Sequence, residues 1–151
     1  MRTLAISIPF VATLLLGTPA HALAAPSVSA QATAGANGLA LEGMGSASTH
    51  IVKVADVLVS TDAANGCTLS ITSGSLTKAG GTPIAFQVVL VADGVSPPSA
   101  SEFPAESGTA YTFATTAAGT VAKDLYIKYL PASLQDPGPY TASIALNVVN
   151  N

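Results

Sequence analysis

Few side chains in this chain of 151 residues could carry chemistry. Past the N-terminal segment, which has the features of a secretory leader, His50 is the only histidine and Cys67 the only cysteine. Catalysis by a serine, histidine and aspartate needs the histidine beside both partners, and His50 lies between Thr49 and Ile51 at the start of a valine-rich segment. A structural zinc site needs four cysteine or histidine ligands. We therefore interpret His50 as a solvent-facing residue at a strand end, and we predict no metal and no cofactor.

The acidic residues offer two further candidates. Asp56, Asp62 and Asn65 form the only tight group of oxygen ligands of the kind calcium prefers, but we favour the simpler interpretation of a polar turn between two strands. Glu102 and Glu106 could act as the carboxylate pair of a glycosidase, yet they lie on a proline-rich loop where nothing predicts the burial that would shift a pKa. No nucleotide-binding or nucleophile motif is present. We predict that the protein is not an enzyme.

Cys67 is in phase with Leu69 and Ile71, which predicts a buried cysteine that acts as a small hydrophobic residue. The alternatives are an exposed free thiol and an intermolecular disulfide. Tyr140 follows a Pro/Gly corner, where we expect it to bond a loop as a tyrosine corner does. Tyr126 is on the opposite strand face from its apolar neighbours, so we expect it at the surface, where it could form a weak sugar-binding platform.

Composition and charge narrow the class of protein. The chain is 49% hydrophobic and only 9% charged, against about 25% charged residues in an average soluble protein. Arg2 is the only arginine and lies in the leader, so four lysines face eight acidic residues and the mature net charge is −4. Nucleic-acid binding needs clustered lysine and arginine. We therefore predict that nucleic acid is not a partner.

The first residues have the three parts of a secretory signal peptide. A short positive start precedes an apolar stretch over 4–17, and small residues follow, which fits cleavage after Ala22 or Ala24. That stretch is shorter than the ~20 residues that span a bilayer. We expect a signal peptide at 1–22, an exported product without stable membrane insertion, and a location in the periplasm, at the cell surface or outside the cell.

Alternating apolar residues predict an all-β domain. Short strands separated by Gly, Pro and Asn-Gly turns are typical of a sandwich or barrel, and no segment has a convincing helical period. We expect an Ala/Gly/Ser-rich arm or edge strands over 23–46, followed by a sandwich domain over 47–151. The expected strands are 27–34, 38–42, 50–60, 67–72, 84–90, 109–115, 121–130 and 140 to the C-terminus, with one helical turn at 132–134.

The segment 136–148 (DPGPYTASIALNV) resembles the closing strand of secreted bacterial immunoglobulin-like domains. Together with 84–91 and 125–129, it resembles the spore coat protein U-like and chaperone–usher pilin group over the C-terminal half of the chain. The resemblance implies an immunoglobulin-like antiparallel sandwich and a subunit of a surface fibre or pilus. Two features depart from that group: Cys67 has no cysteine partner, and Val28 is followed by alanines where a donor strand usually has large apolar residues.

Two functions follow as hypotheses. The first is a structural or adhesive module that associates with itself or with other proteins, with the weak N-terminal strand as the donor in strand exchange. The alternative is a monomeric binding or accessory module with its ligand on loops 94–108 and 131–139, because loops on a rigid scaffold often carry function. In that case we expect that a short Gly/Ser turn could replace loop 94–108 with little loss of stability.

Overall fold

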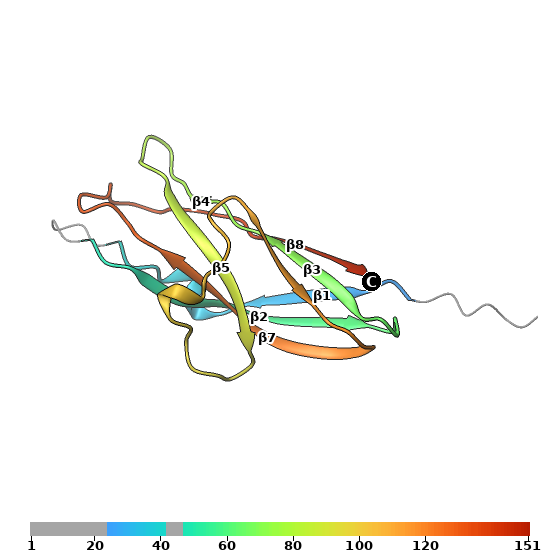
Figure 1. Ribbon diagram of the computed structural model, residues 1–151. Coiled ribbons are helices and arrows are strands. Elements are labelled where there is room, and N and C mark those ends of the chain that lie inside the picture. The colour runs from blue at the N-terminus through green and yellow to red at the C-terminus, as the bar shows by residue number, and fades with distance from the viewer. Residues whose placement is uncertain (1–23, 42–46) are drawn as a thin grey trace, which may run out of the picture.

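The computed structural model describes residues 24–41 and 47–151 and contains two antiparallel β-sheets that face each other (Figure 1). The prediction of an all-β sandwich is confirmed. The proposed signal peptide lies outside the described residues. The strands are β1 (Ser27–Ala32), β2 (His50–Thr61), β3 (Cys67–Thr72), β4 (Ser75–Leu76), β5 (Ile84–Ala92), β6 (Ala110–Ala114), β7 (Gly119–Tyr129) and β8 (Ala145–Asn150).

The larger sheet has the strand order β1-β2-β7-β5-β4. Its centre is the long pairing of β2 with β7, whose register shifts between Lys53 and Ala55. This β-bulge adds one residue to β2, so Lys53 and Asp56, three apart in sequence, come to the same outer face and form an ion pair. The bulge therefore decides which polar side chains of β2 meet those of β7.

The smaller sheet has the order β6-β3-β8, and the core lies between the two sheets. β3 is the central strand, and its inward residues Cys67, Leu69 and Ile71 are at most 1% exposed. The inward residues of β8, which pairs only with β3, are half-buried. The first strand and the C-terminus lie at the same end of the molecule (Figure 1), where the Asn150 amide donates to the Ala24 carbonyl.

The segment between β5 and β6 covers part of the outer face of the larger sheet. It contains the short 3-10 helix η2 (Ala100–Glu102), after which Phe103 packs against Val89 and Tyr126 in a second apolar cluster. Tyr126 is 6% exposed, so the expectation that it lies at the surface is wrong. Alternation gives the face on which a side chain lies, but not whether a distant loop covers that face.

Three local expectations are also wrong. Residues 38–41 form no strand, because after the 3-10 helix η1 (Ala34–Asn37) the side chains of Leu39 and Leu41 pack against the core without a pairing partner. Residue 42 lies outside the described residues. The helical turn expected at 132–134 is a plain turn. The strand expected from Tyr140 begins only at Ala145, because Thr141 pairs with Thr77 before the chain crosses to β3.

Candidate functional site

The two loops that the sequence analysis singled out meet at one pocket of about 820 Å³. Loop 94–108 contributes Ala100, Glu106 and Ser107 to its wall, and loop 131–139 contributes Pro131, Ala132 and Gln135. The start of β5 and the end of β7 supply the floor, and Ala47 and Thr49, just before β2, complete the lining. Because these strands are antiparallel neighbours, the start of one and the end of the other lie at the same end of the sheet.

Polar side chains fix one loop to the pocket. The Gln87 amide on β5 donates to the Ala105 carbonyl at 2.8 Å. The Lys128 ammonium on β7 donates to the Ala100 carbonyl at 2.8 Å and lies 5.1 Å from the centroid of the Phe103 ring. These contacts, with the buried Phe103, order the loop before any ligand binds, which lowers the entropic cost of binding.

Gln135 fixes the other loop, and it is 6% exposed. Its Nε2 donates to the Thr82 carbonyl at 2.8 Å and to Oη of Tyr140 at 2.6 Å, while its Oε1 accepts from the Ala132 amide at 3.1 Å. Tyr140 is therefore bonded to a loop residue, through a side chain rather than through the backbone. No local pattern indicated that Gln135 would be buried, because a lone glutamine in a loop has no periodicity.

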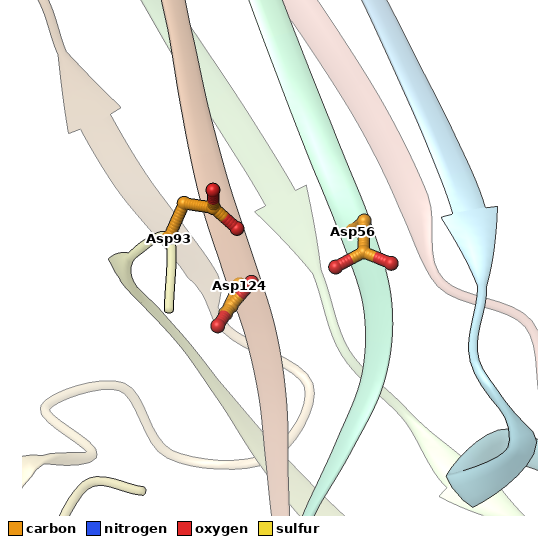
Figure 2. Close-up of side chains that lie close together, drawn as sticks. All are labelled: Asp56, Asp93 and Asp124. Carbon is orange, nitrogen blue, oxygen red and sulfur yellow. The ribbon is translucent and has the colours of Figure 1, made fainter. Parts of the chain in front are cut away.

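A second group of polar residues lies on the outer face of the larger sheet, away from this pocket. Figure 2 shows Asp56 on β2, Asp124 on β7 and Asp93, just after β5, with their carboxylates gathered on the same side of the sheet. One oxygen of each lies within 4.8 Å of the others. Asp56 and Asp124 are direct cross-strand partners, and like charges in that position destabilise a sheet unless a cation lies between them.

Lys53 supplies that cation. Its Nζ lies 2.7 Å from Oδ1 of Asp56 and 2.7 Å from Oδ1 of Asp124. Oδ1 of Asp124 is buried, and the Lys53 ammonium at 2.7 Å is the cation that compensates its charge. Oδ2 of Asp124 accepts from the Gly94 amide at 3.1 Å, which fastens the start of loop 94–108 to β7.

These contacts shift two pKa values. Desolvation is the largest single effect on Asp124 and raises its pKa, but the hydrogen bonds and charge of Lys53, with the Gly94 amide, together outweigh it and hold the pKa below the ordinary aspartate value. Hydrogen bonds to Asp124 and then to Asp56 raise the pKa of Lys53 above its usual range. Both shifts favour the charged pair at neutral pH.

The calcium candidate considered from the sequence is not assembled. Asp56 and Asp62 are six residues apart on an extended segment, or about 20 Å, and Asp62 accepts from the Ala24 amide instead. The partners of Asp56 are Asp93 and Asp124, which sequence reasoning missed because it could not supply the strand register. Since the Lys53 ammonium already pairs with both Asp56 and Asp124, we interpret this group as an internal ion network.

The two glutamates of loop 94–108 differ in their surroundings. Glu102 closes a capping box on η2, where its Oε2 accepts from the Ser99 amide at 2.6 Å and from the Ser99 hydroxyl at 2.8 Å. The backbone bond, followed by the hydroxyl bond, lowers its pKa. Glu106 is exposed and lines the pocket. The structure therefore gives Glu102 a structural role and leaves Glu106 in the pocket wall.

His50 and Cys67, the two other candidate residues, each contact a neighbouring side chain. The His50 ring stacks on Tyr129 with ring centroids 5.1 Å apart. Cys67 is 1% exposed, and its Sγ lies 3.6 Å from Oγ1 of Thr115. The thiol therefore faces the core rather than the surface.

Neither a scan with protein-family models nor a search of curated proteins finds a match for this chain. Over the part of the chain that the structure describes, no helix has the length and apolar character needed to cross a membrane.

Proposed function

We propose that this protein is an exported, non-enzymatic binding module whose ligand lies in the pocket between loops 94–108 and 131–139. One observation carries the proposal: two loops that are distant in sequence converge on a single pocket of about 820 Å³. Small-molecule sites in proteins enclose about 300–1,000 Å³ and combine an apolar lining with a few placed polar groups.

The rigidity of the walls supports the same function. Gln87, Lys128 and Gln135 each bond loop backbone, so the pocket does not have to be organised by its ligand. Phe103 is part of an apolar cluster, so we now expect that replacing loop 94–108 would cost stability. A test of binding therefore needs point substitutions rather than loop removal.

The test uses a bulky residue to fill the pocket. Ala85 is exposed on the floor of the pocket, and Ala122 is exposed on the outer face of β7, away from it. Binding of small aromatic probes is followed by amide chemical shifts in the mature protein and in its Ala85→Trp and Ala122→Trp variants. We expect shifts clustered at 82–87 and 128–132, lost in Ala85→Trp and kept in Ala122→Trp. Shifts that do not cluster, or that survive Ala85→Trp, would refute the proposed site.

A second candidate function is a structural or adhesive module of the fibre-subunit kind, and β1 is the feature that favours it. β1 pairs antiparallel with β2 at the edge of the larger sheet, yet five of its six residues are exposed and only Val28 packs against the core. A strand held mainly by backbone pairing can exchange between copies at low cost.

Strand exchange has a direct test. Ser29 and Leu58 are cross-strand partners in β1 and β2, at a spacing that suits a disulfide. The double variant Ser29→Cys, Leu58→Cys locks β1 in place when oxidised. If the module assembles by exchange, light scattering will show polymers in the wild type and in the reduced variant, and monomers in the oxidised variant. Polymers formed by variant monomers that were isolated after oxidation would exclude exchange of β1.

A further inference from the structure

The pocket between the two loops has an apolar surface suited to a ring or an alkyl chain. Pro83 and Ala85 come from the β5 side, and Leu130 directly follows the end of β7. Leu130 is 56% exposed, a large apolar side chain left in water at the wall. Covering such surface is favourable, because it removes apolar area from water.

Some charged and amide side chains of the pocket lining are bonded within the protein, and one is not. Gln87, Lys128 and Gln135 are all bonded to loop carbonyls. The backbone of Glu106 is also held, because its carbonyl accepts from both the amide and the hydroxyl of Thr109. The Glu106 carboxylate has no hydrogen-bond or ion-pair partner among the described residues, whereas the Lys128 ammonium is already bonded to a carbonyl.

We propose that the pocket takes a ligand with an apolar body and a basic nitrogen, and that the ammonium or guanidinium group pairs with Glu106. This inference rests on the proposed binding function and names the ligand class for the same pocket. Lys128 is the only other charged residue of the lining, and its ammonium is turned toward the Ala100 carbonyl and the Phe103 ring. The charged side chain of the lining that has no partner of its own is therefore a carboxylate, which a basic group of a ligand can pair with.

The test compares three probes that share a ring and differ in charge: benzylamine, benzyl alcohol and benzoate. Affinities are measured at low salt by amide shifts in the mature protein, in Glu106→Gln, and in Asp62→Asn, which removes the same charge at the opposite end of β2. A partly exposed ion pair changes affinity by about two- to five-fold. We expect benzylamine to bind more tightly than benzyl alcohol by that factor, and benzoate to bind most weakly.

The variants and the salt dependence test whether the charge of Glu106 causes the preference for benzylamine. Glu106→Gln is expected to bring benzylamine and benzyl alcohol to equal affinity, while Asp62→Asn keeps the preference. Added salt should reduce the preference in the wild type, since exposed charges are screened. Equal affinities of all three probes in the wild type, or tightest binding of benzoate, would overturn the inference and leave the binding function standing. Absence of pocket binding by every probe would instead refute the proposed function.

Discussion

Lys53 and Asp124 join β2 to β7 through an ion pair of 2.7 Å on the outer face of the larger sheet. The side chain of Asp124 is 2% exposed and that of Lys53 is 31% exposed, so the pair is a buried acid reached by a partly solvated base. The bulge at Lys53 and the Asp124–Gly94 bond connect the pair to the central register and to loop 94–108. Loss of either partner should therefore affect both the sheet and the loop.

Asp124→Ala is expected to destabilise the fold by about 1–3 kcal/mol, because the Gly94 amide loses its acceptor and Lys53 keeps only Asp56. The measurement is the free energy of unfolding in urea at pH 7. Asp56→Ala is the matched control, since Asp56 is exposed and its removal leaves the pair between Lys53 and Asp124 intact. If Asp124→Ala lowers the free energy of unfolding no more than Asp56→Ala does, the pair contributes nothing to stability.

Acid should weaken the stabilisation that the Asp124 carboxylate gives to the fold. The folded pKa of Asp124 lies below its unfolded value, so its stabilisation is fully present above about pH 4 and is lost as the pH falls through the folded pKa. The difference in unfolding free energy between the wild type and Asp124→Asn should be constant from pH 5 to 7 and shrink below about pH 4. A difference that grows on acidification would contradict the direction of the shift.

Lys53→Met should reverse that pH dependence. It leaves three carboxylates within 4.8 Å of one another, and desolvation and repulsion then raise the folded pKa of Asp124 above its unfolded value. The variant is expected to be less stable than the wild type at pH 7 and to gain stability as the pH falls toward 4, measured in the same urea series. Lys53→Arg keeps the charge and should retain the wild-type profile. A variant without that gain would show that the carboxylates do not repel.

Phe103 should anchor loop 94–108. It is 5% exposed against Val89 and Tyr126, and truncating a buried phenylalanine to alanine costs about 3 kcal/mol or more. Phe103→Ala should lower the unfolding free energy by about that amount and speed hydrogen exchange of the loop amides. Val95→Ala, at a side chain 47% exposed in the same loop, should change stability by less than about 0.5 kcal/mol. Equal effects of the two variants would mean that the cluster does not hold the loop.

Cys67 should react with a thiol reagent only on unfolding, because its side chain is 1% exposed in the native core. The check is the rate of colour release from a chromogenic disulfide with and without urea. Light scattering tests independently for a disulfide-linked dimer. The molar mass of the protein should be the same with and without reductant. A reductant-sensitive dimer would mean that the thiol reaches the surface in solution.

Much of the fold could be predicted from local patterns. The alternation of Cys67, Leu69 and Ile71 correctly placed the inward face of β3, and the valine-rich run from His50 correctly indicated β2. The two loops of the candidate pocket were chosen for their turn residues, and they lie where antiparallel pairing brings them. These features are local, since side-chain alternation and turn chemistry are set by neighbouring residues.

Pairing and coverage were decided only by the tertiary structure. Asp124 has the same local sequence signals as any surface acid, yet the register with Asp56 and the Gly94 turn make it buried and ion-paired. Tyr126 has an outward phase, yet Phe103 covers it. Thr141 continues the alternation that precedes β8, yet it pairs with Thr77 in an isolated bridge. Regular strand pairing begins only at Ala145. By itself, the sequence determined which faces are apolar; which elements meet across those faces depends on long-range contacts that no local pattern encodes.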